Sequence, residues 1–140
     1  MLGGKGPLIR QIAEAVRNIA REVKENREGT SYTFFAKLPA DKFRAVMILI
    51  WRLLMKRMEM GEVINMRVNE GEFRDMGLKT ITIKRGEVWE FYDYEEFSHH
   101  YIRLLEMERE GESWIALYID YNERSPWWTS RERGEATSQG

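Results

Sequence analysis

Apolar residues near the start of the chain recur at helical spacing, in alternating steps of three and four residues. This pattern predicts a helix that begins near Pro7 and ends before Gly29. The apolar residues form a narrow seam, which fits either an amphipathic helix lying on its own sheet or a contact between subunits. The seam consists of Ile9, Ile12, Val16, Ile19 and Val23.

The segment 30–38 alternates between two sets of side chains, which predicts a strand. The even-numbered residues from Tyr32 to Leu38 would face the core. Phe35 and Lys37 would then face away from it, because successive side chains of a strand point to opposite faces.

A second helix is predicted to begin at Pro39 and to run to about Met60, just before Gly61. Residues 46–54 are apolar on nearly every side of this helix, so we expect it to be the central helix of the core. Its polar face carries cations, namely Arg44, Arg52 and Lys56.

The rest of the chain is rich in β-forming residues. The predicted strands are 63–69, 78–85, 87–94 and 113–121, with 78–85 and 87–94 forming a hairpin about Arg85 and Gly86. The segment 95–110 is ambiguous, because its apolar residues recur at helical spacing while 101–109 could also pair with the last strand. We favour the helix.

These elements predict an α+β protein, in which a mostly antiparallel sheet of four to five strands packs against two or three helices. Residues 1–121 would form a single domain. Residues 122–140 are polar apart from Trp127 and Trp128, so we expect a largely disordered tail.

Composition narrows the class of protein. The chain has no cysteine, and its longest apolar run, 45–51, is too short to cross a bilayer, so we expect a cytoplasmic protein without a membrane partner. Charged residues make up 32% of the chain, which is typical of hyperthermophile proteins. Residues 1–60 hold 12 Lys and Arg against 6 Asp and Glu, whereas residues 61–140 hold 10 against 17, so one basic side is compatible with the sequence.

The strand face that points away from the core is the candidate binding surface. If Ile64, Met66, Ile81 and Ile83 face the core with the even-numbered residues of 30–38, the two-residue period of a strand determines the opposite face. Trp89 and Phe91 cannot point inward together with Tyr92 and Tyr94, so one of these pairs joins that face. The candidate binding residues on it are Phe35, Lys37, Arg67, Trp114 and Tyr118.

Aromatic rings interleaved with cations are what unpaired bases and their phosphates require. The cationic face of the second helix, Arg44, Arg52 and Lys56, could add phosphate contacts. The alternative is a sheet covered by helices on both faces, which would bury the same rings as core.

A basic helical first half, aromatic-rich strands, the lack of cysteine and a polar tail together resemble the single-stranded DNA-binding proteins of hyperthermophilic archaea known as ThermoDBP, over residues 7–121. That family lines an open cleft with hydrophobic and basic residues and associates through helices. The resemblance implies an archaeal source and DNA rather than RNA as the ligand. It also implies a cleft lined by Phe35, Trp114 and the Arg52 and Lys56 side.

Catalytic motifs are missing from the sequence. His99 and His100 are adjacent, so they cannot easily share one metal, and no Gly-rich phosphate loop follows a strand. We therefore expect no enzyme activity, no cofactor and no metal. The leading hypothesis is a homo-oligomer, dimeric or tetrameric through the first helix, that binds single-stranded DNA, with RNA as the alternative ligand.

Two other hypotheses stay open. One is a protein-interaction module that docks through the first helix and the Trp127 and Trp128 segment. The other is a metal-dependent enzyme with ligands at Asp93, Glu96 and His99, in which Glu96 and His99 have the spacing of metal ligands on a helix and Asp93 lies just upstream.

Overall fold

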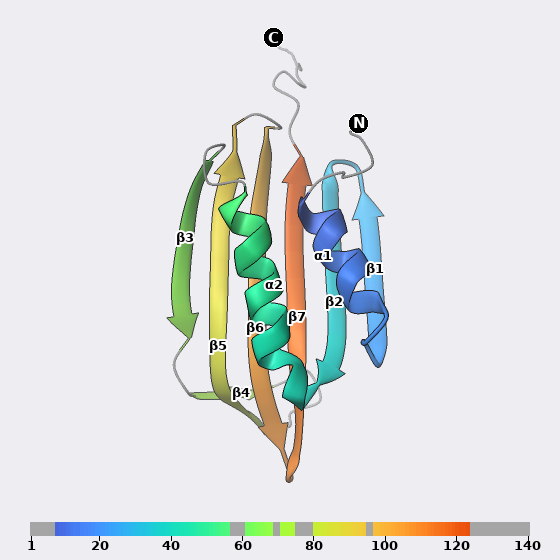
Figure 1. The fold of residues 1–140 in the computed structure, drawn as a ribbon. Helices are drawn as coiled ribbons and strands as arrows, with labels where there is room; N and C mark the ends of the chain where they lie inside the picture. Colours follow the sequence, from blue (N-terminus) through green and yellow to red (C-terminus); the bar gives the residue numbers. More distant parts are fainter. Residues whose placement is uncertain (1–7, 57–60, 69–70, 75–79, 95–96, 124–140) are drawn as a thin grey trace.

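A single antiparallel sheet organises the chain, and both helices lie on the same face of it (Figure 1). The sheet has seven strands in the order β1-β2-β7-β6-β5-β3, with β4 paired separately to β5. The computed structural model describes residues 8–56, 61–68, 71–74, 80–94 and 97–123. The predicted α+β class and antiparallel sheet are confirmed, whereas the expected four to five strands were too few.

The elements follow one another with short connections. The helices are α1 (Leu8–Arg17), a 3-10 turn η1 (Ala40–Lys42) and α2 (Phe43–Met55). The strands are β1 (Glu22–Glu28), β2 (Ser31–Pro39), β3 (Gly61–Val68), β4 (Gly71–Arg74), β5 (Thr80–Asp93), β6 (Ser98–Arg109) and β7 (Glu112–Glu123). β7 extends past the predicted domain end at residue 121, and the tail 124–140 with Trp127 and Trp128 lies outside the described residues.

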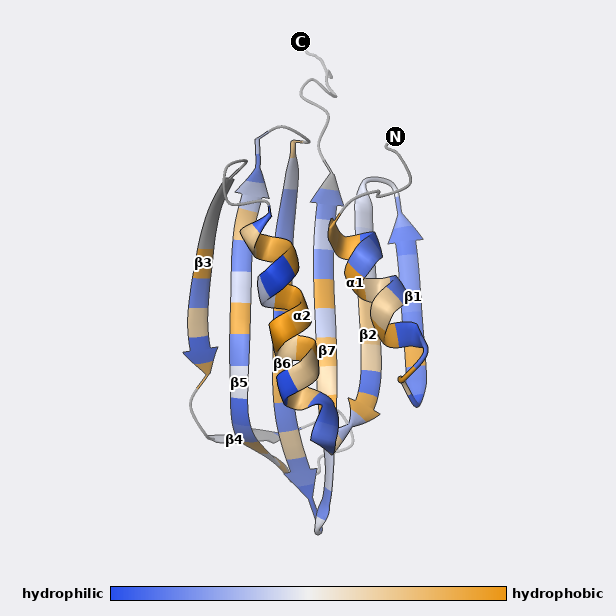
Figure 2. Ribbon diagram, in the orientation of Figure 1, coloured by the Kyte–Doolittle hydropathy of each residue, from blue (hydrophilic) through white to orange (hydrophobic). Residues whose placement is uncertain are grey.

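The main core lies between the two helices and the sheet. Ile12 and Val16 of α1 and Ile50 and Leu54 of α2 are fully buried. They belong to one cluster with the inward residues of the central strands. Figure 2 shows hydrophobic and hydrophilic residues alternating along these strands behind the helices. The predicted faces of 30–38 are confirmed, since Phe34, Ala36 and Leu38 are buried on this side.

The first helix is shorter than predicted. It ends at Arg17, and the residues expected to continue it form the edge strand β1. Gly29 adopts a φ of 60°, which glycine tolerates best, and this allows the tight turn between β1 and β2. Ile19 and Val23 still pack against the main core, so their helical spacing was fortuitous.

The α1 seam is used inside its own chain. Ile9, Ile12 and Val16 are at most 2% exposed. These three residues therefore pack in the core of the same subunit, and little of their surface is left for the predicted contact between subunits.

A small polar cluster fastens α1 to the edge of the sheet. Arg17 pairs with Glu25 of β1, and the Tyr32 hydroxyl donates to the same carboxylate. These two hydrogen bonds hold the pKa of Glu25 below its ordinary value.

The predicted hairpin within 78–94 is wrong, because β5 runs unbroken through Gly86 with a bulge between Ile83 and Arg85. A Cβ atom on Gly86 would lie 2.5 Å from Leu105 Cδ2. The lack of a side chain at Gly86 leaves room for the Leu105 side chain of β6, and the chain does not turn here.

The helix predicted over 95–110 is also wrong. This segment contains β6, which pairs with β5 on one side and β7 on the other. Glu110 and Gly111, both with positive φ, make the turn into β7, as the alternative interpretation of this segment required.

Candidate functional site

One face of the sheet is left without a helix in the part of the chain that the structure describes. Both helices pack on the opposite face. We call this helix-free side the open face. It carries the second set of side chains of each strand, because neighbours directly opposite each other in an antiparallel sheet share a face.

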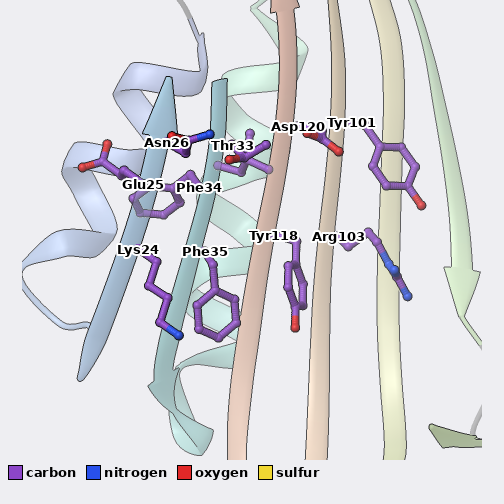
Figure 3. A pocket seen from close by; sticks show the side chains of 11 residues that line it. Lys24, Glu25, Asn26, Thr33, Phe34, Phe35, Tyr101, Arg103, Tyr118 and Asp120 are labelled. Atoms are coloured by element: carbon purple, nitrogen blue, oxygen red, sulfur yellow. The ribbon is translucent and has the colours of Figure 1, made fainter. Parts of the chain in front are cut away.

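Four side chains on the open face form a row across four adjacent strands. Lys24 of β1 lies opposite Phe35 of β2, Phe35 lies opposite Tyr118 of β7, and Tyr118 lies opposite Arg103 of β6. Figure 3 shows this order of cation, ring, ring and cation. We call these four residues the aromatic row.

The two rings of the aromatic row touch each other and are reachable from solvent. The centroids of Phe35 and Tyr118 are 4.9 Å apart, with an angle of 49° between the ring planes. Tyr118 is 40% exposed, and Phe35 is half-buried. A groove of about 300 Å³ runs beside them and is also lined by Thr33, Tyr101 and Asp120. A flat molecule therefore has ring surface on which to lie.

Arg103 has hydrogen-bonding capacity that the described residues do not use. Its Nε atom is buried and has no hydrogen-bond partner among them. By contrast, Arg67 and Arg85 each pair with a carboxylate, on Glu87 and Glu106 respectively. A guanidinium presents a fork of hydrogen-bond donors that suits phosphate or carboxylate oxygens. Arg103 is therefore well suited to bind an anion beside the rings.

Charge is unevenly arranged around the aromatic row. On one side, Lys37 places its ammonium 5.0 Å from the centre of the Trp114 ring. Glu22 lies opposite Lys37 and forms an ion pair with Lys24 at 3.4 Å. On the other side, Asp120 and Glu90 flank Tyr101 in the next row of the sheet. A polyanion on the open face would therefore be attracted mainly to Arg103 and Lys37 and repelled from the row that holds Asp120 and Glu90.

Of the predicted binding residues, Phe35, Lys37 and Tyr118 lie on the open face as expected. Trp114 is on this face too but is only 8% exposed, so little of its ring is left on which the predicted base could stack. It belongs to a second, smaller cluster with Ile81, Ile83, Leu105, Met107 and Ala116. Ile81 and Ile83 were expected in the main core, and instead they help to bury this ring.

Arg67 lies on the face opposite to the one predicted. It pairs with Glu87, which is 5% exposed. The Asn65 side-chain amide donates a second hydrogen bond of 2.9 Å to the same carboxylate. Ile64 and Met66 consequently face the open side, where they are 51% and 57% exposed. The pairing register of β3 causes this reversal, because a shift of one residue moves every side chain to the other face.

The α2 cations are also far from the rings. Phe43, Val46, Ile50 and Leu54 face the sheet, so the exposed Arg44, Arg52 and Lys56 point away from it. They lie on the opposite side of the sheet from the aromatic row. The predicted cleft that combines them with Phe35 and Trp114 is therefore wrong.

The burial pattern of β5 shows which of its two aromatic pairs faces the core. Trp89 and Phe91 are buried in the main core, so Tyr92 falls on the open face opposite His99. Asp93 pairs in register with Ser98, so Asp93 and His99 point to opposite faces, and Glu96 lies outside the described residues. Within the described ranges, no group of three or more His, Asp or Glu residues is placed to hold a metal.

Sequence reasoning missed Lys24, Tyr101 and Arg103. They lie in segments whose apolar spacing predicts helices, so the pattern assigns them no strand face. The alternation of Tyr101, Arg103, Leu105 and Met107 on one face is the signal that could have found them.

No helix in the described parts of the chain has both the length and the apolar character needed to cross a membrane. Comparison with protein-family models, with curated proteins and with solved structures returns no match for this chain.

Proposed function

We propose that the open face binds single-stranded nucleic acid. Bases stack on Phe35 and Tyr118, and backbone phosphates contact Arg103 and Lys24. The observation that carries the proposal is the aromatic row itself, with two adjoining rings between two cations in one line of the sheet. Stacking on an aromatic side chain contributes about 1–3 kcal/mol per base, whichever base is present.

The geometry of the row favours an unpaired strand over a duplex. Bases in a duplex are stacked on one another inside the helix and cannot reach a protein ring. The row crosses three gaps between strands and is therefore about 14 Å long, from the spacing of strands in a sheet. This length suits a short stretch of extended strand that crosses the β-strands.

Binding through phosphate contacts should weaken as the salt concentration rises. Lys24, Lys37 and Arg103 are the cations beside the two rings, so about two or three phosphates are neutralised. For single strands, the logarithm of the binding constant should then fall with the logarithm of salt concentration with a slope of about −1.4 to −2.1. The measurement is a titration of labelled oligo-dT, and in parallel oligo-U, at several salt concentrations.

Variants on the two sides of the sheet distinguish binding at the open face from binding at the face that carries the helices. Arg103→Ala should reduce affinity and make the slope shallower by about one phosphate equivalent, about 0.7. Arg52→Ala, on the other side of the sheet, should change neither quantity. The proposal fails if oligo-dT and oligo-U do not bind at low salt, or if Arg52→Ala weakens binding as much as Arg103→Ala does.

A further inference from the structure

The two edges of the sheet are built differently. The edge strand β1 is mostly charged, with Glu22, Lys24, Glu25, Arg27 and Glu28 among its residues. Charged side chains along an edge discourage pairing with another chain. β1 is therefore protected against association in the usual way.

The opposite edge, β3, lacks this protection over its central residues. Among the described strands it pairs only with β5. Its open-face residues Ile64 and Met66 are 51% and 57% exposed, and Asn65 between them is uncharged. The outer N–H and C=O groups of such a strand are a template for one more strand.

We propose that β3 pairs antiparallel with β3 of a second copy of this chain, about a two-fold axis at Asn65. In this register Ile64 lies opposite the partner's Met66, and Met66 lies opposite the partner's Ile64. Residues directly opposite one another share a face, so all four apolar side chains meet on the open face. The occupant is a second copy because the strand complements itself in this register.

The neighbouring charge agrees with this register. Arg67 is held by Glu87 on the helix face, and centring the pair on Asn65 keeps the two Arg67 side chains apart. Centring the pair on Arg67 would instead place like charges directly opposite, which is unfavourable. The dimer would join the two sheets into one continuous sheet with both open faces on the same side, and its formation does not depend on the proposed ligand.

Disulfide cross-linking tests the register, and the absence of native cysteine removes any background. The full chain carrying Ile64→Cys and Met66→Cys should form a covalent dimer on mild oxidation, because paired positions in adjacent strands place their Cβ atoms within disulfide range. The matched control on the other edge, Asn26→Cys with Glu28→Cys, should stay monomeric. Equal cross-linking of both pairs, or none with Ile64→Cys and Met66→Cys, overturns the proposal.

Light scattering provides the second readout. The wild-type chain should have the mass of two 16.7 kDa subunits, and Met66→Lys should halve that mass while leaving the far-UV circular dichroism unchanged. A wild-type protein with the mass of one subunit at every concentration contradicts the proposal. So does a Met66→Lys variant that keeps the dimer mass.

Discussion

Replacing both rings of the aromatic row, Phe35→Ala with Tyr118→Ala, is expected to weaken oligo-dT binding by about 2–6 kcal/mol, because two stacking surfaces are lost. The lower limit already corresponds to a loss of affinity of roughly thirty-fold. Tyr118→Ala alone should account for about 1–3 kcal/mol of this loss. Fluorescence anisotropy with a labelled oligo-dT at low salt measures both values.

Two control variants show whether the loss of affinity comes from the rings of the aromatic row. Tyr118→Phe keeps the ring and should bind nearly as well as the wild type. Tyr94→Ala removes a ring that is more exposed, at 65%, but lies outside the aromatic row, so it should have little effect. Phe35 also packs against the second cluster, so the free energy of unfolding of each variant must be measured alongside. Equal losses for Tyr94→Ala and Tyr118→Ala would refute stacking on the row.

Trp89→Ala is expected to have the largest effect on stability, lowering the free energy of unfolding by about 3–5 kcal/mol. Trp89 is fully buried under α2, where its ring meets Trp51 edge to face with centroids 6.0 Å apart. Removing the indole leaves a cavity that the strands on either side cannot close. Urea denaturation followed by circular dichroism measures the change.

A matched variant separates packing from hydrogen bonding at the same position. The Trp89 indole N–H has no hydrogen-bond partner among the described residues, so Trp89→Phe loses volume but no hydrogen bond. Trp89→Phe should therefore lower the free energy of unfolding clearly less than Trp89→Ala does. A Trp89→Ala variant within about 1 kcal/mol of the wild type would contradict the placement of this ring in the main core.

The sequence was most informative where a strand has one buried and one exposed face. The alternation over 30–38 predicts β2 and both of its faces correctly, because its inner side lies on the helices and its outer side on the open face. β6 is different. Leu104 belongs to the main core, and the adjacent Leu105 belongs to the second cluster on the other face. A strand buried on both faces loses its alternation, and two adjacent leucines then resemble a helical pattern.

The candidate site could be predicted only in part for a related reason. Phe35 and Tyr118 lie in strands whose faces the pattern determines. The face of Arg67 depends on the pairing register of β3, and the burial of Trp114 depends on a second cluster formed by residues distant in sequence. The sequence also gives the charge of the α2 cations but not the side of the sheet on which they lie, so it could not separate them from the rings.

Ultraviolet cross-linking to oligo-dT followed by peptide mapping locates the bound strand on the protein. We expect cross-links at Phe35 and Tyr118, on the β2 and β7 peptides, and their loss when an unlabelled single strand competes. Cross-links confined to the α2 peptide that carries Arg44 and Arg52, or no cross-link at all at low salt, would contradict it.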